Sequence, residues 1–342
     1  MHTIPTYYLV LDANIWIAER LLYSPLGSAT LFALTKSGAR IGLPEVVKLE
    51  VRHTLLDQTD KAITSIKKSS QLLRHLSGHQ MSVMAPSQEA IEGGITRRWN
   101  DLSGVLTEIP FTFAHARIAL TRIIEKVPPC GPNNEQFRDC CIWQSSLDLA
   151  EHCAVHFVTN DHAFYDGGTR SHGLSTPLRE ELTRLDRTIH IYSSLNQFLD
   201  TMDKSTTAID EAKIAAEIVE AVKPHAREIA SSGSPSNAFD LRHVEKTRII
   251  GYATPKPSLV AVSFSVTFAM SRLADVGANE DRISATLTVV GGCSHEPNSD
   301  TLSDVEISEW TMASRGGRGG WSRSSQNSTF SNQFSEGKFR IL

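Results

Sequence analysis

The sequence predicts two domains: an α/β domain with a mostly parallel central sheet, and a smaller α+β domain with an antiparallel sheet. Up to about Leu199, short apolar runs alternate with longer stretches of helical periodicity, which is typical of a parallel sheet. From about Lys204, one amphipathic helix precedes long runs in which apolar and polar residues alternate. At 342 residues, the chain is long enough for two hydrophobic cores. We therefore expect an α/β domain at residues 1–203, an α+β domain at 204–313 and a low-complexity tail at 314–342.

In the first domain, strands are expected where short apolar runs stop at turn residues. The expected strands are Tyr7–Leu11, Ala39–Leu43, Val155–Thr159 and Ile189–Tyr192. Between them, apolar residues recur at helical spacing, and Pro44 suits the first turn of a long helix. The expected helices are Leu26–Lys36, Glu45–Leu76, Ser87–Val105, Phe113–Lys126, Gln136–His152, and a short one that Ser194 caps and that ends near Met202.

The second domain is expected to begin with a helix, because Ile209, Ile218 and Val222 share a helical stripe that ends near Pro224. A polar surface loop at Ser231–Asn237 should follow. About four strands come next and should form an antiparallel sheet against the helix: Thr247–Ala253, Val260–Ala269, Ile283–Val290 and Val305–Trp310. The tail is rich in Gly, Arg and Ser; such short tracts can hold single-stranded nucleic acid but are more often flexible tails.

The composition excludes several classes of protein. With 40% hydrophobic and 21% charged residues, the chain is neither fibrous nor mostly disordered. It shows no secretory leader and no apolar run of bilayer length, so we expect a cytoplasmic protein without a membrane partner. Five cysteines without a CxxC pair indicate reduced thiols rather than disulfides or structural zinc. The net charge is −4, yet Lys61–His79 contains no acidic residue and is either a solvated helix face or a phosphate-binding surface.

Two acidic residues follow expected strands, one directly and one after a single intervening residue. Asp12 comes after the first strand, and Asp161 comes two residues after Thr159, where another strand ends. The carboxyl ends of parallel strands meet at one edge of a sheet, where ligands bind in open α/β folds. Each acid alone could simply cap the next helix. A half-buried carboxylate also requires a cation or hydrogen-bond donors.

Two further acids lie where helical periodicity calls for apolar residues. Glu50 shares a helix face with Val46 and Val47, and Asp139 shares one with Ile142 and Trp143. Asp139 also falls in the first turn of its helix, where the helix dipole stabilises an acid. A shared cation explains these two inward acids together with the two strand-end acids, and an all-carboxylate set favours Mg²⁺ or Mn²⁺ over zinc.

The segments around these acids resemble the four acidic motifs of the PIN domain family. They are Leu9–Asn14, Leu43–Glu50, Phe137–Trp143 and Phe157–Phe164, and their order and spacing match the family. Within it, the chain is most similar to bacterial PIN-like proteins with an additional C-terminal domain. The resemblance covers roughly the first two hundred residues and implies a Rossmann-like α/β/α sandwich with a central parallel sheet.

The resemblance also implies a metal-dependent nuclease, with single-stranded RNA ranked above DNA as substrate. The catalytic and metal-binding residues would be Asp12, Glu50, Asp139 and Asp161, and the supporting residues Asn14, Thr159 and Asp166. The cofactor would be Mg²⁺ or Mn²⁺. Possible phosphate contacts are Lys48, Arg52, Lys67, Lys68, Arg74 and Arg138. A homodimer or a regulatory protein partner is possible, and a toxin-like or defence role is an expectation by analogy with the family alone.

Two other functions compete with the nuclease. A PIN fold can serve as a nucleic-acid-binding or regulatory module without turnover, although such degenerate domains usually lose one or more of the acids. A haloacid-dehalogenase-like phosphatase also starts from a strand-end Asp. That family requires Asp-x-Asp, and here Asn14 occupies the second position, so this alternative is the weaker one.

Overall fold

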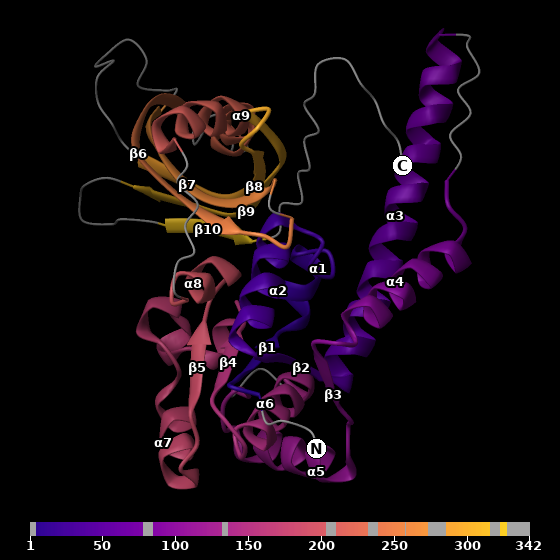
Figure 1. Cartoon of the computed structure of the whole chain (residues 1–342), viewed down its shortest axis with the longest axis vertical. Helices are drawn as coiled ribbons and strands as arrows, with labels where there is room; N and C mark the ends of the chain where they lie inside the picture. Colours follow the sequence, from indigo (N-terminus) through magenta and orange to yellow (C-terminus); the bar gives the residue numbers. More distant parts are fainter. Residues whose placement is uncertain are drawn as a thin grey trace. The chain divides into compact units, whose positions relative to one another are not determined.

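The structure is a computed structural model that describes residues 5–77, 85–131, 136–202, 210–231, 239–256, 258–272, 285–314 and 322–326. The chain divides into two compact units (Figure 1). The first unit contains residues 1–21 and 33–201, and the second contains residues 22–32 and 202–342. Each unit contains one sheet of five strands, which is parallel in the first and antiparallel in the second.

The parallel sheet has the strand order β3-β2-β1-β4-β5. The strands are β1 (Tyr8–Leu11), β2 (Arg40–Pro44), β3 (Leu106–Ile109), β4 (Val155–Val158) and β5 (Ile189–Tyr192). All neighbouring strands run parallel, and Leu11 at the end of β1 pairs with Val158 at the end of β4. The central strand β1 is buried along its whole length. The predicted α/β domain with a central parallel sheet is confirmed.

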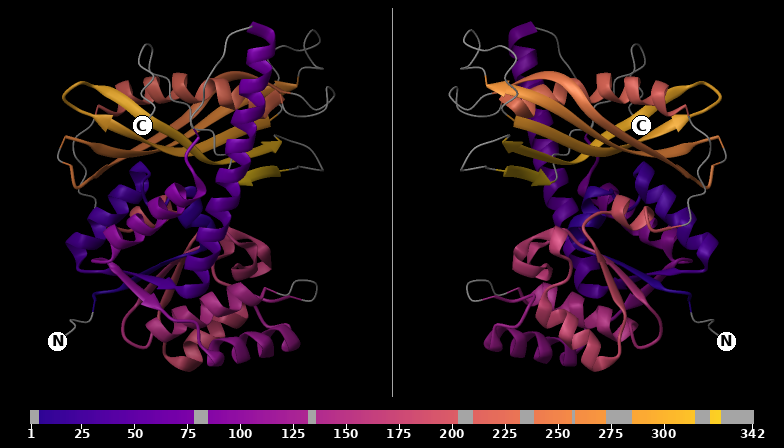
Figure 2. Two further views of the ribbon diagram at one scale, coloured as in Figure 1. Left: turned by 90° about the vertical axis from the view of Figure 1, so that its right-hand side faces the viewer. Right: turned by 90° about the vertical axis from the view of Figure 1, so that its left-hand side faces the viewer.

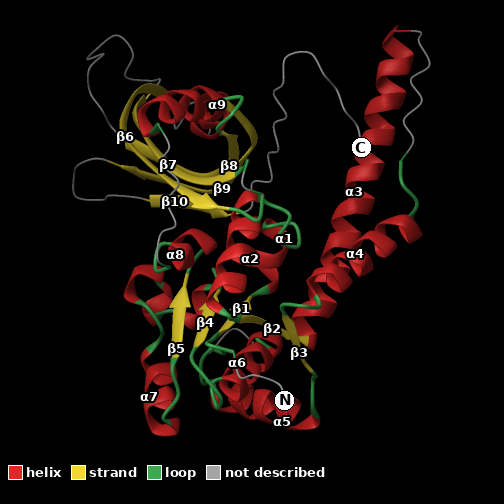
Figure 3. Cartoon of the chain, viewed as in Figure 1, coloured by secondary structure: helices red, strands yellow, loops and turns green. Residues whose placement is uncertain are grey.

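Helices cover both faces of this sheet (Figures 2 and 3). In the first unit they are α1 (Ala13–Ala18), α3 (Glu45–Ser77), α4 (Gln88–Leu102), α5 (Phe113–Glu125), α6 (Phe137–Leu149), α7 (Thr176–Leu185) and α8 (Leu195–Leu199). Helix α2 (Pro25–Ser37) is divided, because its residues up to Phe32 belong to the second unit. Because side chains alternate along a strand, His156 packs against Phe198 of α8, while the next residue, Phe157, packs against Phe164. Phe164 in turn contacts Trp143 of α6, so α6 and α8 lie on opposite faces.

Three local predictions in the first unit were wrong or incomplete. Pro44, expected in the first turn of the long helix, is instead the last residue of β2, where it pairs with Ile109, while α3 begins at Glu45 as predicted. Strand β3 was missed because it is a short edge strand with only its first residue, Leu106, buried. Helix α7 was also missed; it is short, and its buried stripe consists of Leu178 and Leu182 alone.

In the second unit, the sheet has the order β10-β9-β8-β7-β6 and is antiparallel throughout. Its strands are β6 (Phe239–Ala253), β7 (Val260–Arg272), β8 (Ala285–Glu296), β9 (Thr301–Ser314) and β10 (Ser322–Gln326). The period-two pattern predicted for β7 is confirmed, since Val262, Phe264 and Val266 lie in one core with α9 (Glu211–Ser231). The backbones of β8 and β9 approach each other closely at Gly291, where a Cβ atom would lie 1.9 Å from the Glu306 carbonyl oxygen, so a side chain would not fit there.

Two predictions for this unit need correction. Helix α9 passes through Pro224 and ends at Ser231, because the buried stripe continues with Ala226 and Ile229 beyond the exposed proline. The sheet has five strands rather than four, and β10 lies inside the segment predicted to be a tail. The predicted loop after Ser231 and most of the tail lie outside the described residues.

Among the described helices, none combines the length and the apolar character that a membrane span requires. All five cysteines are free thiols, and all are buried except Cys153, which is partly exposed.

Candidate active site

Asp12 is fixed at the carboxyl edge of the parallel sheet. It follows β1 directly and caps the N-terminus of α1, where its Oδ1 accepts a hydrogen bond from the Ala13 amide at 2.6 Å. Its Oδ2 accepts a hydrogen bond from the Thr159 hydroxyl at 2.8 Å, and its amide donates to the Val158 carbonyl at 3.0 Å. The residue is only 4% exposed. The Asp12 carboxylate is therefore held in one orientation by the start of α1 and by the residue that follows β4.

Asp161 lies beside Asp12 in the sheet edge and shares a partner with it. The Thr159 hydroxyl accepts a hydrogen bond from the Asp161 amide at 3.1 Å, while it donates to Asp12. Asp161 caps the 3₁₀ helix η1 (His162–Phe164), and its Oδ1 accepts from the Ala163 amide at 2.8 Å. Thr159 is fully buried and thus links the two strand-end acids.

Glu50 and Asp139 come from helices α3 and α6. Glu50 lies between the buried residues Val47 and Val51, and its side chain is 22% exposed. Its Oε1 forms an ion pair with Nη1 of Arg138. Asp139 occupies the first turn of α6 and is half-buried. Both acids are therefore partly buried and lie next to buried residues of their own helices.

The four acids lie close enough for their charges to act on one another. We call Asp12, Glu50, Asp139 and Asp161 together the acidic cluster. The pKa of Asp139 is raised to about 8, first by burial and then by the charges of Asp12, Asp161 and Glu50, against the attraction of Arg138. Burial also raises the pKa of Asp12 to about 6, with smaller contributions from Asp161 and Glu50; the hydrogen bonds from Thr159 and Ala13 oppose the shift. Burial likewise raises the pKa of Glu50. Negative charge here is costly until a cation balances it.

The donor set suits a hard cation, because all four side chains offer carboxylate oxygens. Among the described residues, no three His, Cys, Asp or Glu side chains stand in a geometry that would already hold an ion. Oxygens of Asp12 and Asp161 bind helix-capping amides, and Glu50 binds Arg138. Metal binding at Glu50 would therefore require its carboxylate to leave Arg138.

The other predicted supporting residues differ from Thr159. Asn14 is an exposed residue of α1. Asp166 begins η2 (Asp166–Gly168), and its Oδ2 accepts a hydrogen bond from Thr176 at 3.4 Å and lies 3.7 Å from Nη2 of Arg179. The Asp166 carboxylate is thus engaged with α7.

The cations proposed to contact nucleic acid form two groups. Those close to the acids along the chain are ion-paired: Lys48 with Glu108 at 2.6 Å, Arg52 with Glu92 at 3.1 Å, and Arg138 with Glu50. The others are exposed on the distal part of α3, namely Lys67, Lys68 and Arg74.

Two residues near the acids were missed by sequence reasoning. Gln136, just before α6, donates from Nε2 to Oδ2 of Asp161 at 3.5 Å. The buried Tyr165 hydroxyl donates to the Thr159 carbonyl at 2.6 Å and so supports the residue that orients Asp12. Gln136 could have been noticed from its place just before the motif of Asp139, whereas no pattern in the sequence pointed to Tyr165.

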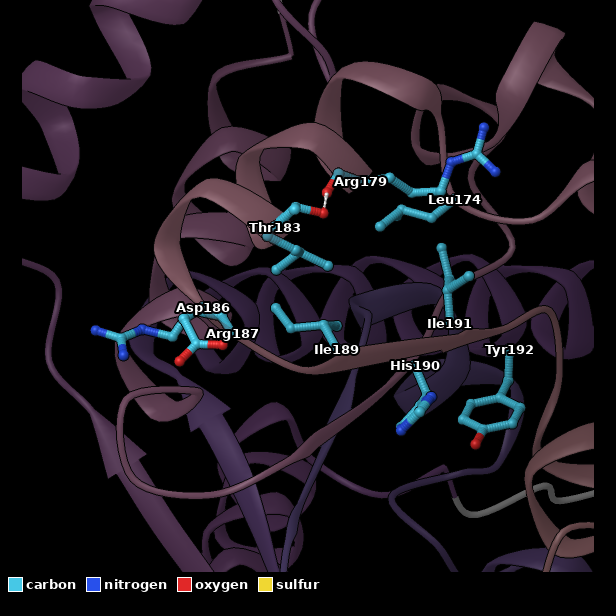
Figure 4. A pocket seen from close by; sticks show the side chains of 10 residues that line it. Leu174, Arg179, Thr183, Asp186, Arg187, Ile189, His190, Ile191 and Tyr192 are labelled. Atoms are coloured by element: carbon cyan, nitrogen blue, oxygen red, sulfur yellow. Dashed lines mark hydrogen bonds between the residues drawn. The ribbon is translucent and has the colours of Figure 1, made fainter.

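A separate pocket lies between α7 and β5 (Figure 4). Its lining includes Leu174, Arg179, Arg187, His190 and Tyr192, and contains none of the four acids. It is therefore distinct from the acidic cluster.

The comparison with known families agrees with this geometry. Residues 9–164 match the model of a family described as a PIN domain, and this range contains all four acids. Members of the family are typically nucleases. No curated protein and no solved structure matches the chain significantly. The N-terminal part of the chain, at residues 9–164, is a PIN domain, and an additional C-terminal region follows it.

Proposed function

We propose that this protein is a divalent-metal-dependent nuclease that hydrolyses phosphodiester bonds in single-stranded RNA. The observation that carries the proposal is the acidic cluster: four carboxylates from two strand ends and two helices, coupled by mutual repulsion, at the carboxyl edge of the sheet of a PIN domain. Buried acids with strongly raised pKa values are concentrated at functional sites, because such a group of like charges is unfavourable for folding.

Mg²⁺ or Mn²⁺ fits the oxygen-only donor set of this cluster. Asp12 and Asp139 would hold the principal ion, and Glu50 and Asp161 would complete the site or hold a second ion. The ion would activate a water molecule and stabilise charge on the attacking and leaving oxygens. The chain itself orients Asp12 through the Thr159 hydroxyl and the Ala13 amide, and such supporting hydrogen bonds tune the ligands of a metal.

The substrate is proposed to follow helix α3 away from the acids. Glu50 and the exposed cations lie on the same helix, and the helical rise places Lys67 about 25 Å beyond Glu50. Lys67, Lys68 and Arg74 are exposed there, in a stretch without acidic residues after Asp60, where phosphates would be attracted. RNA is ranked above DNA from the family alone.

The direct test is cleavage of labelled single-stranded RNA and of DNA of the same sequence by purified protein. We expect RNA cleavage with Mg²⁺ or Mn²⁺, none with EDTA, and none by Asp12→Asn or Asp139→Asn. Asp148→Asn is the matched control: Asp148 lies on the same helix as Asp139 but binds His115 and Gln144, at 2.8 and 2.9 Å. It should cleave as the parent does.

A binding module without turnover predicts a different result. The parent would then bind RNA and cleave neither substrate under any metal condition, and Asp161→Asn would keep its affinity. Normal cleavage by both Asp12→Asn and Asp139→Asn would show that the acidic cluster takes no part in catalysis. Preferred cleavage of DNA would overturn the substrate assignment alone.

A further inference from the structure

The ion pair between Arg138 and Glu50 occupies one of the carboxylates of the acidic cluster. The two residues come from different helices, Arg138 from the first turn of α6 and Glu50 from α3. The Glu50 side chain is 22% exposed, whereas that of Arg138 is 65% exposed. The charge of Arg138 also acts on the adjacent Asp139, where it opposes the repulsion from the other acids. Arg138 is therefore a counter-ion for two of the four acids.

A divalent cation and the guanidinium group would compete for Glu50. Arg138 holds Oε1 of this carboxylate, and a guanidinium group and a metal ion held at one carboxylate repel each other. The loss of the ion pair costs little, because Arg138 is mostly exposed and its charge can be solvated. A bound metal would therefore take the place of Arg138 at Glu50 and leave the guanidinium free beside the site.

We propose that Arg138 is an exchangeable counter-ion, which neutralises Glu50 in the metal-free protein and binds a substrate phosphate once a metal ion has taken Glu50. The inference rests on the proposed function, since it assumes that a phosphodiester occupies the site. A guanidinium group presents a planar fork of donors that matches two phosphate oxygens, and a lysine cannot reproduce this geometry. Arg138 is thus a substrate-positioning residue that becomes available only in the metal-bound state.

The other ion-paired cations would not respond to the metal in this way. Lys48 binds Glu108 and Arg52 binds Glu92, and neither of these carboxylates belongs to the acidic cluster. Metal binding removes no partner from them. The exchange is therefore specific to Arg138, and a matched control is available at Arg187. That residue forms an Arg–Glu pair with Glu151 at 2.8 Å and precedes β5, at the amino end of the strand.

The first measurement is the affinity for Mn²⁺ alone, determined by calorimetry for the parent protein, Arg138→Gln and Arg187→Gln. We expect Arg138→Gln to bind Mn²⁺ about 3- to 10-fold more tightly, because the ion no longer displaces a guanidinium group. Arg187→Gln should match the parent. The Arg138 side chain is 65% exposed and that of Arg187 is 27% exposed, so neither replacement opens the buried core and the folded protein should be retained.

The second measurement is the affinity for a fluorescent single-stranded RNA, in EDTA and in Ca²⁺ as a metal that is not expected to support turnover. With Ca²⁺, Arg138→Gln should weaken RNA binding about 10-fold, and Arg138→Lys should restore only part of the loss. In EDTA the loss should fall below about 2-fold, because Arg138 then remains with Glu50. The dependence on metal distinguishes the exchange from a permanent phosphate contact.

An equal loss of RNA affinity with and without Ca²⁺ would overturn the exchange, as would unchanged or weaker Mn²⁺ binding by Arg138→Gln. Failure of the proposed function looks different. If the parent shows both effects at Arg138 but cleaves nothing with Mg²⁺ or Mn²⁺, the exchange stands and the nuclease assignment falls. If the parent binds no Mn²⁺, both fall.

Discussion

Helix α6 contributes to two groups of buried charged residues in the PIN domain, and the two groups balance their charges differently. In the acidic cluster, Asp139 is surrounded by other carboxylates that raise its pKa. One turn later, Trp143 joins a network in which charges are paired. There Arg122 forms an ion pair with Glu181 and donates to the Pro128 carbonyl at 2.9 Å, and the Trp143 indole donates to Glu181 at 2.8 Å.

This difference separates a structural use of buried charge from a functional one. The Arg122–Glu181 network satisfies its charges within the chain, and removal of either partner would leave the other buried without compensation. The acidic cluster keeps a surplus of negative charge at a cost to folding. Such a cost is expected where an external cation completes the site. Mutations in the two regions should therefore affect different properties.

The largest expected effect is the loss of activity in Asp139→Asn. Without this carboxylate, the site loses a ligand of its principal ion, and we expect cleavage of RNA to fall on the order of 10³-fold. Glu181→Gln, in the balanced network, should keep the parent rate at 25 °C once its folded fraction is taken into account. An equal loss of the initial rate of RNA cleavage in Asp139→Asn and Glu181→Gln would show that the two regions do not differ in function.

The next effect is on stability, and it belongs to the balanced network. Glu181→Ala should lower the free energy of unfolding by about 3 kcal/mol, because it leaves the buried guanidinium group of Arg122 unpaired. The double variant Arg122→Met/Glu181→Leu should recover most of this loss. Urea denaturation followed by circular dichroism measures both. A loss well below 1 kcal/mol for Glu181→Ala would show that the network is not structural.

A smaller effect of opposite sign is expected for Asp139→Asn in EDTA. The pKa of Asp139 is about 8 in the folded protein, above its ordinary value of 3.8. Between these two pH values, the folded protein keeps a proton on Asp139 that the unfolded chain releases. The stability of the parent should therefore fall as the pH rises through this window. At the upper end, Asp139→Asn should be more stable than the parent by on the order of 1 kcal/mol, a difference that shrinks toward pH 5. Urea denaturation across this range would contradict the account if the parent were the more stable protein throughout.

The smallest effect concerns a half-buried histidine on the other face of the sheet. Burial, with a contribution from His190, lowers the pKa of His156 from 6.5 to about 4. The unfolded chain then binds a proton that the folded chain does not, so stability should fall as the pH decreases from 6.5 to 4. We expect a loss of about 0.5 kcal/mol after allowance for its partial exposure. His156→Gln should lose less over the same range in thermal melts, and an identical loss would assign the effect to other groups.

The sequence predicted the parallel sheet and the positions of the four acids, because both follow from local patterns. Asp12 and Asp161 follow apolar runs of strand length, and Glu50 and Asp139 interrupt apolar helical stripes. Buried strands and inward helix faces impose these patterns strongly. Strand β3 and helix α7 escaped detection because each buries only one or two apolar residues.

The partners of the acids could not be predicted, because they depend on contacts between distant segments. The hydrogen bond from Thr159 to Asp12 joins residues 147 positions apart, and the Arg138–Glu50 pair joins two helices. At Pro224 a local pattern gave the wrong prediction. The proline predicted the end of the helix, but α9 continues because its apolar stripe packs into the core of the second unit. Local patterns thus identified the acids but not how the fold holds them.

The most direct test of the central claim is a titration of the parent protein and Asp139→Asn with Mg²⁺ or Mn²⁺, followed by thermal unfolding near neutral pH. A cation that balances the acidic cluster should raise the melting temperature of the parent by several degrees. It should leave that of Asp139→Asn nearly unchanged, while Glu181→Gln, although less stable, should respond as the parent does. No stabilisation of the parent, or equal stabilisation of the parent and Asp139→Asn, would contradict the assignment of the acidic cluster as a metal site.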